Sequence, residues 1–478
     1  MGGGLPRNHL YLLDGEPGTG KTTLALQFLL EGAREGERGL YVTLSESESE
    51  LTEVAQSHGW TLDKVTVFEL SAETAGSSDE EYTIFHPVEV ELQETLAAVF
   101  EIVEQTKPTR VVIDSLSELR LLARDPLRFR RQILSLKQFF AGRDCTVLLL
   151  DDRSAPSGDM QLHSLAHGVV MLEHLALEYG ADRRRLRVTK LRGVPFRGGY
   201  HDFRIRTGGI QVFQRILTAA ASPPEVGGSV CSGNPALETL LGGGLTRGTS
   251  TLITGAAGTG KTVICVQYLH AAVMRGETVS AFMFDERLST FWMRARSLGF
   301  DFDDAVKDGR LRIHQVEPTE MSPGEFANVV RAAVETHGST MVVIDSVNGY
   351  MNAMPSERLL GIQLHELLSY LANRGVTSIL TLVQHGVFSG PVDEAAEVSY
   401  LADTVILLRY FEYQGTVRNA ISVVKKRSGP HEKTIREFRI GAGGLKVGEP
   451  LEEFQGVLTG VPHYRGEREP LMSPDGRA

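Results

Sequence analysis

Short apolar runs alternate along the chain with longer segments in which apolar residues recur at helical spacing. Residues 9–15 (HLYLLDG) and 249–255 (TSTLITG) have the length and composition of buried strands. Each run is followed by a glycine-rich turn and then by a helical pattern, in residues 22–36 and 262–276 respectively. Strands that alternate with helices predict a mostly parallel sheet covered by helices on both faces, with ligands at the carboxyl ends of the strands.

The same series of patterns occurs twice. GGGLPR in residues 2–7 recurs as GGGLTR in residues 242–247, and RVVIDSL in residues 110–116 recurs as MVVIDSV in residues 341–347. A repeat of over two hundred residues is too long for a solenoid unit, so it predicts a duplicated α/β domain. The expected organisation is a first domain in 1–215, an Ala-, Ser- and Pro-rich linker in 216–231, a second domain in 232–460 and a flexible tail in 461–478.

Composition and charge narrow the class of protein. Hydrophobic residues are 42% and charged residues 23% of the chain, as in a globular protein, and the formal net charge is −11. The acidic balance disfavours nucleic acid as a partner. The apolar runs are shorter than the roughly 20 residues of a membrane span, and the first residues lack an export signal. With Cys145, Cys231 and Cys265 far apart, we expect reduced thiols, a cytoplasmic location and no membrane contact.

Two stretches carry a pattern with a known chemistry. GEPGTGKT and GAAGTGKT both match G-x-x-x-x-G-K-[ST], in which backbone N–H groups surround phosphate oxygens and a helix begins at the phosphates. Each match follows a predicted strand and opens a predicted helix, which is the context that this motif requires. The predicted ATP-binding residues are Gly15, Glu16, Pro17, Gly18, Thr19, Gly20, Lys21 and Thr22 in the first copy, and Gly255, Ala256, Ala257, Gly258, Thr259, Gly260, Lys261 and Thr262 in the second.

The motif also predicts a magnesium ion. Its lysine reaches the β and γ phosphates, and its hydroxyl residue coordinates Mg²⁺, with an acid at the end of a later apolar strand as the outer-shell partner of the metal. The predicted magnesium-side pairs are Thr22 with Asp114 and Thr262 with Asp345. ATP and Mg²⁺ are therefore the expected cofactors.

Acids follow the second predicted strand of each copy. Hydrolysis needs a group that orients the attacking water, and a carboxylate at the tip of a strand beside the P-loop strand would suit it. Asp285 and Glu286 stand there in the second copy, and Ser45 and Glu46 in the first. The alternative is a solvated acidic loop, which the first copy's SESESE favours almost as strongly.

Together these stretches carry a resemblance to a known family. GGGLTRG before the P-loop, FMFDER, VVIDS, KLRG and KKRSGPH resemble the KaiC-like family of double-domain circadian clock ATPases, within the RecA/DnaB-like superfamily, over nearly the whole chain. The resemblance implies two tandem RecA-like P-loop domains, each forming one tier of a homohexamer with ATP between neighbouring subunits. It also implies that Glu46, Asp285 and Glu286 activate a water or a hydroxyl, and that signalling or Kai-type proteins are partners.

The family places a Lys-x-Arg on a late strand, where it reaches the γ phosphate of the neighbouring subunit's ATP. The matching residues are Lys190 and Arg192 in the first copy, and Lys425 and Arg427 in the second. Cations supplied in trans stabilise the charge that develops during phosphoryl transfer. The alternative is a solvated basic strand edge.

Three departures from the family pattern bear on function. The opening helix of the family, present in the second copy as GNPALETLLGGG, is missing before Gly2. Ser45 replaces one of the paired glutamates, so the two domains are expected to hydrolyse ATP at different rates. The tandem Ser-Thr phosphoacceptor of the family reads Ser399-Tyr400 here, so autokinase activity is expected at Ser399 alone.

The sequence thus predicts an ATP-hydrolysing signalling protein that assembles as a hexamer. Two other functions stay open at this point. One is a DNA-processing motor or recombinase, because the superfamily includes both, and the other is a nucleotide-gated scaffold that does not hydrolyse ATP.

Overall fold

A computed structural model of the chain describes residues 3–70, 87–123, 125–152, 160–177, 179–216, 227–352, 360–384, 399–457 and 463–464. The chain divides into two compact units, Met1–Arg215 and Ile216–Ala478, which are described separately. Most of the expected linker and nearly all of the expected tail lie outside the described residues.

The first unit is built on one nine-stranded sheet in the order β3-β2-β4-β5-β1-β6-β7-β8-β9. The pairs from β3 to β6 are parallel, and those from β6 to β9 are antiparallel. The strands are β1 (Leu10–Gly15), β2 (Gly39–Thr43), β3 (Val65–Glu69), β4 (Arg110–Asp114), β5 (Thr146–Asp152), β6 (Gly168–Leu175), β7 (Arg183–Leu191), β8 (Tyr200–Arg206) and β9 (Gly209–Phe213).

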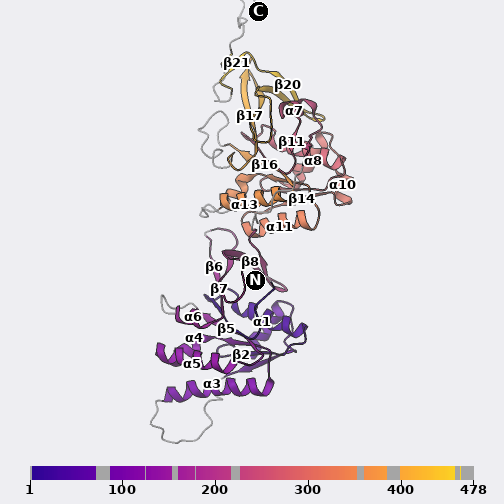
Figure 1. Cartoon of the computed structure of the whole chain (residues 1–478). Coiled ribbons are helices and arrows are strands. Elements are labelled where there is room, and N and C mark those ends of the chain that lie inside the picture. The colour runs from indigo at the N-terminus through magenta and orange to yellow at the C-terminus, as the bar shows by residue number, and fades with distance from the viewer. Residues whose placement is uncertain are drawn as a thin grey trace, which may run out of the picture. The chain divides into compact units, whose positions relative to one another are not determined.

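Helices cover both faces of this sheet (Figure 1). They are α1 (Lys21–Arg34) and α2 (Glu48–Ser57) on one face, and α3 (Pro87–Thr106), α4 (Leu116–Ala123), α5 (Pro126–Phe140) and α6 (Met160–Leu165) on the other. Alternate residues of β1 serve the two faces: Tyr11 and Leu13 belong to the core under α1, and Leu10 and Leu12 to the core under α3 and α5. The apolar run of β1 is therefore buried on both sides, as expected for a central parallel strand.

The second unit repeats this architecture, with a nine-stranded sheet in the order β14-β13-β15-β16-β12-β17-β18-β19-β20. Its strands are β12 (Ser250–Gly255), β13 (Val279–Met283), β14 (Leu311–Gln315), β15 (Met341–Asp345), β16 (Thr377–Val383), β17 (Thr404–Tyr413), β18 (Thr416–Lys426), β19 (Arg436–Gly441) and β20 (Gly444–Pro450). Two small ribbons pair β10 (Ser229–Val230) with β11 (Leu245–Thr246) and β21 (Phe454–Gln455) with β22 (His463–Tyr464).

Helices again form two layers. They are α7 (Pro235–Leu240), α8 (Lys261–Met274), α9 (Leu288–Ser297) and α10 (Asp303–Lys307) on one face, and α11 (Pro323–Glu335), α12 (Val347–Asn352) and α13 (Leu360–Asn373) on the other (Figure 1). Two mostly parallel sheets flanked by helices confirm the predicted fold class, two tandem RecA-like domains. Among the described residues, no helix combines the length and the apolar character needed to cross a membrane.

One expectation about strand order is wrong. The acids Glu46, Asp285 and Glu286 do not follow a strand beside the P-loop strand, because β15 and β16 lie between β13 and β12, and β4 and β5 lie between β2 and β1. The order of parallel strands depends on where each crossover helix returns the chain, which local patterns do not reveal. These acids therefore follow strands that are separated from the P-loop strand by two other strands.

The repeated glycine-arginine stretch has the same contact in both units. Arg7 Nη2 lies 2.7 Å from Glu37 Oε1, and Arg247 Nη2 lies 3.0 Å from Glu277 Oε1. Burial alone would raise the pKa of Glu277, but hydrogen bonds from Arg247, Arg275 and Thr340 hold that pKa at about 2. This ion pair joins the segment before the P-loop strand of each domain to the residues just before its second strand.

Candidate functional site

The first glycine-rich turn joins the end of β1 to the start of α1. Gly18 and Gly20 have φ values of 78° and 99°, in the left-handed region that favours glycine. A Cβ on Gly15 would lie 2.8 Å from the carbonyl oxygen of Leu172, so this position also requires glycine. Gly20 caps α1 without a side-chain hydrogen bond, which leaves the first N–H groups of the helix suited to an anion.

The second turn, between β12 and α8, has the same backbone. Gly258 and Gly260 have φ values of 80° and 99°, and Gly260 caps α8 without a side-chain hydrogen bond. Tyr410 of β17 braces this loop, because its hydroxyl donates to the carbonyl oxygen of Ala257 at 3.2 Å and would lie 2.7 Å from a Cβ on Gly258. No sequence motif marks this tyrosine, so its role was not predicted.

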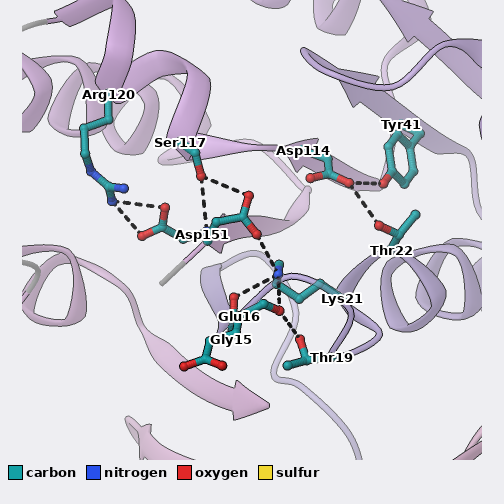
Figure 2. Close-up of polar contacts among 11 residues, drawn as sticks. Gly15, Glu16, Thr19, Lys21, Thr22, Tyr41, Asp114, Ser117, Arg120 and Asp151 are labelled. Atoms are coloured by element: carbon teal, nitrogen blue, oxygen red, sulfur yellow. Dashed lines mark hydrogen bonds and ion pairs between the residues drawn. The ribbon is translucent and has the colours of Figure 1, made fainter. Parts of the chain in front are cut away.

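The two P-loop lysines adopt the same conformation. Lys21 Nζ donates to the carbonyl oxygens of Gly15 and Glu16 at 2.8 and 2.9 Å, as Figure 2 shows. Lys261 Nζ makes the corresponding contacts at 2.9 and 2.8 Å. Both side chains are buried, and burial lowers the pKa of Lys261 while the charge of Asp345 opposes the change. Each ammonium is therefore held over the loop that would surround the phosphates.

The predicted magnesium-side residues meet in the first domain. Thr22 Oγ1 lies 3.5 Å from Asp114 Oδ2, which also accepts a hydrogen bond from the Tyr41 hydroxyl at 2.5 Å (Figure 2). Burial raises the pKa of Asp114, and the hydrogen bond from Tyr41 opposes this rise. The charge of Asp152 acts in the same direction as burial.

They also meet in the second domain. Thr262 Oγ1 donates to Asp345 Oδ2 at 2.7 Å, and Thr381 Oγ1 donates to the other oxygen of Asp345. In both domains the peptide bond after this aspartate is cis. A hydroxyl backed by a carboxylate fits Mg²⁺, which takes few protein ligands and completes its shell with phosphate and water oxygens. Thr22 and Thr262 would hold the metal, with Asp114 and Asp345 behind them.

Glu46 offers an unpaired carboxylate oxygen near the first P-loop. Its Oε2 is buried and has no hydrogen-bond partner within the described part of the chain. Its backbone is fixed by Thr43, whose Oγ1 donates to the Glu46 carbonyl oxygen at 2.7 Å. Burial, and then the charge of Asp114, raises the pKa of Glu46. Such an oxygen could accept a proton or hydrogen bond from water.

The two acids of the second domain have different partners. Asp285 Oδ2 accepts a hydrogen bond from Ser346 Oγ, so it is linked to the strand end that carries Asp345. Glu286 forms a two-point ion pair with Arg294, at 2.7 and 2.9 Å. Burial raises the pKa of Glu286, and the charge of Arg294 opposes the rise. Asp285 is thus linked to the residue that follows Asp345, and Glu286 is held by α9.

The Lys-x-Arg residues are bound to backbone carbonyls in a matching way. Lys190 Nζ donates to the carbonyl oxygens of His163 and Ser164 at 2.6 and 3.2 Å, and Arg192 Nη2 donates to Ser164 at 3.1 Å. Lys190 lies in β7, and Arg192 follows its last residue. Burial, and then the charge of Arg192, lowers the pKa of Lys190.

In the second domain, Lys425 Nζ donates to the carbonyl oxygens of Ser399 and Ala402 at 2.9 and 2.7 Å. Arg427 Nη2 donates to the Tyr400 carbonyl oxygen at 3.1 Å, and its Nη1 lies 3.5 Å from Asp403 Oδ1. Ser399, the expected phosphoacceptor, therefore lies beside the Lys-Arg pair. Residues 385–398, which precede it, lie outside the described residues.

The Lys-Arg pairs and the P-loops lie at opposite ends of the strands in each sheet. The Arg192 backbone N–H donates to His167, whose own N–H donates to Leu10, the first residue of β1. The P-loop begins at Gly15, the last residue of β1, which is roughly 17 Å away at the usual rise of a strand. The structure therefore does not bring Lys190 and Arg192 to the P-loop of their own domain.

The same separation holds in the second domain. The Arg427 backbone N–H donates to Asp403, and the Asp403 N–H donates to Ser250, the first residue of β12. Gly255 and the second P-loop lie at the far end of that strand.

One acid of the first site was not predicted. Asp152 Oδ1 lies 2.7 Å from Lys21 Nζ, and Asp152 is the last residue of β5. The signal was present in the repeat, because LLLDD in residues 148–152 aligns with the acid-free ILTLV in residues 379–383.

Comparison with known proteins finds a family that matches nearly the whole chain. A family model described as ATPase: KaiC matches residues 1–216 and 230–452. The chain is 26% identical to a Synechocystis protein named circadian clock protein KaiC3, over 98% of this chain and 93% of that protein. It is 28% identical to the circadian clock oscillator protein KaiC of Thermostichus vulcanus and 27% identical to that of Synechococcus elongatus, in each case over 96% of this chain and 89% of the relative.

Proposed function

The chain belongs to the KaiC family of ATPases, and from that premise we propose that both of its domains bind Mg·ATP and hydrolyse it within a homohexameric ring. Each P-loop combines left-handed glycines, a buried lysine and a free helix N-terminus. The Thr-Asp pair beside each loop supplies the oxygen donors that a magnesium ion needs.

The separation of the Lys-Arg pair from the P-loop of its own domain supports the proposal of a ring. A cation that assists phosphoryl transfer must contact the γ phosphate, but Arg192 and Arg427 lie a strand's length from their own P-loops. A neighbouring subunit placed head to tail would bring its Lys-Arg edge against this subunit's P-loop edge. Such heterologous contacts form a closed ring when the rotation between subunits closes.

Within each site we assign the water-orienting role to a carboxylate. Glu46, with its unpaired buried oxygen, is the candidate in the first domain. Asp285 and Glu286 are the candidates in the second domain, where Asp285 is linked to the metal-side strand through Ser346. A carboxylate whose pKa is raised by burial, as for Glu46 and Glu286, is a better proton acceptor in catalysis.

We further propose that the second domain phosphorylates Ser399. Its backbone is fixed by Lys425, the residue assigned to the neighbour's γ phosphate, so a neighbour's nucleotide would lie close to this segment. Tyr400 cannot replace a threonine acceptor, because its ring carries the hydroxyl several ångströms farther from the backbone. One acceptor rather than two is therefore proposed.

Nucleotide state would then control contacts with signalling partners, which the KaiC names of the relatives suggest to be of the Kai type. The acidic net charge of −11 supports a protein without a nucleic-acid partner. The three widely separated cysteines support a cytoplasmic location.

Light scattering and phosphate release, measured together with and without Mg·ATP, test the proposal. We expect ATP-dependent growth to six chains and release of phosphate. Assembly without release would support a nucleotide-gated scaffold instead. If ATP causes neither assembly nor phosphate release, the proposed function is excluded. Binding of single-stranded DNA with a steep salt dependence would favour a DNA-processing ATPase.

A further inference from the structure

The first domain places a carboxylate on its P-loop lysine. Asp152 Oδ1 lies 2.7 Å from Lys21 Nζ, and Asp152 is paired in register with Gly15 across β5 and β1. Ser117 of α4 fixes this carboxylate from the other side: its Oγ donates to Asp152 Oδ2 at 3.2 Å and accepts from the Asp152 backbone N–H at 3.2 Å. In Figure 2, the dashed lines from Ser117 and from Lys21 end on the same carboxylate, which is drawn without a label.

The second domain has no acid at this position. The residue paired in register with Gly255 is Val383, which has no charge to offer Lys261. Asn348 stands where Ser117 does, but it contacts the backbone of Val383, accepting its N–H at 2.6 Å and donating to its carbonyl oxygen at 3.0 Å. The two P-loops therefore have the same backbone conformation, but only the first has a carboxylate, that of Asp152, in contact with its lysine.

This difference bears directly on phosphate binding. A lysine ammonium has three N–H donors, and Lys21 already serves two carbonyl oxygens and Asp152. ATP phosphates that approach Lys21 must share it with Asp152 and also meet the negative charge of that carboxylate. The charges of Asp114 and Asp152 both act on Glu46, so three acids share this small region.

Resting on the proposed function, we propose that Asp152 is an affinity-determining residue of the first nucleotide site. It competes with the phosphates of ATP for Lys21, so the first domain binds ATP weakly unless a divalent cation offsets the combined negative charge. The second domain, with Val383 in that place, binds ATP with much less dependence on the cation. The two domains of one chain would thus respond differently to free Mg²⁺.

Calorimetric titration of ATP into the full chain, in EDTA and in Mg²⁺, tests this proposal. Lys261→Ala removes the P-loop lysine of the second site, so that the titration measures ATP binding at the first site. Adding Asp152→Val, or Asp152→Asn to keep the volume, should raise the ATP affinity in EDTA by roughly tenfold and in Mg²⁺ by less than about threefold. Asp63→Asn, which removes a charge from an exposed acid of the same domain, is the control and should change neither affinity.

The reverse exchange gives an independent test. Val383→Asp in a Lys21→Ala chain should lower the ATP affinity of the second domain in EDTA by roughly tenfold. Unchanged or weaker ATP binding in EDTA by both Asp152 variants would overturn this inference but not the proposed function. So would loss of phosphate release by Asp152→Asn at unchanged affinity, which would assign Asp152 to the water instead. If the parent chains bind no ATP even in Mg²⁺, the proposed function fails as well.

Discussion

Thr262 Oγ1 donates a hydrogen bond of 2.7 Å to Asp345 Oδ2, across 83 residues of sequence. The two residues belong to the start of α8 and the end of β15. A single contact thus joins the phosphate loop to the strand end that would stand behind the magnesium ion.

Asp345→Asn should raise the Mg²⁺ concentration needed for half-maximal phosphate release by the second domain. An amide in that place removes the negative charge that orients Thr262, and loss of an outer-shell partner of a metal commonly costs about 10- to 100-fold in metal affinity. Titration of Mg²⁺ in the Lys21→Ala chain measures the effect. Asp301→Asn, at an exposed acid of the same domain, should leave the midpoint where it is, and an unmoved midpoint for Asp345→Asn would remove Asp345 from the metal side.

Mixing subunits should restore activity to two inactive variants. A boundary between Arg427→Ala and Lys261→Ala subunits can combine an intact P-loop with an intact arginine, so random mixing should return up to roughly a quarter of the second-domain phosphate release. The matched control replaces the second partner by a Lys261→Ala, Arg427→Ala double variant, which offers no intact arginine. Equal activity in the two mixtures would mean that each site is complete within one subunit.

Phosphorylation should stop at one site. After incubation with Mg·ATP, intact-mass and peptide mass spectrometry should find at most one phosphate per chain, on Ser399. It should disappear in Ser399→Ala and in Lys261→Ala and persist in Lys21→Ala. Two phosphates at Ser399 and Tyr400, or one that survives Lys261→Ala, would contradict the assignment.

Glu277→Gln should destabilise the second domain in a pH-dependent way. The pKa of Glu277 is about 2 in the folded chain against an ordinary value of 4.5, so its contribution is complete above pH 4.5 and is lost as the pH falls toward 2. Because the ion pair is partly open to solvent, we expect a loss on the order of 1 kcal/mol at pH 7 and less at pH 3.

Urea unfolding can resolve this effect by domain. The chain has two tryptophans, Trp60 in the first domain and Trp292 in the second, so Trp60→Phe leaves fluorescence that reports the second domain alone. The exposed Glu452→Gln is the charge control. A loss for Glu277→Gln that stays constant from pH 7 to pH 3 would show that the ionised carboxylate contributes nothing.

Local patterns predicted the parts of the site that are local in sequence. Lys21 and Thr22 follow from the glycine spacing of one turn, and the strand that ends in Asp114 carries its own apolar signature. The approach of Thr22 to Asp114 was also predicted, because the motif implies a distant partner. Strand order was not, since it depends on the return of each crossover, and the expected neighbour of the P-loop strand was wrong.

The contact between Asp152 and Lys21 was missed for a related reason. An acid at the end of an apolar run is common where a strand reaches solvent, so nothing marks Asp152 within its own segment. Only the register of β5 against β1 places it opposite Gly15. The same holds for Arg192. Only its backbone hydrogen bond to His167, and that of His167 to Leu10, show that Arg192 lies at the end of the sheet opposite the P-loop.

The placement of P-loop and arginine at opposite ends of one strand has a consequence for dilution. Under the proposed assembly, one chain alone holds two half-sites per domain and no complete one. An open row of chains always leaves one unmatched half-site per domain at each end, and only closure of the ring completes them all. The rate of ATP hydrolysis per chain would then rise with protein concentration and level off once the rings are closed. The concentration dependence of this rate would therefore report the fraction of sites that are incomplete at the ends of open assemblies.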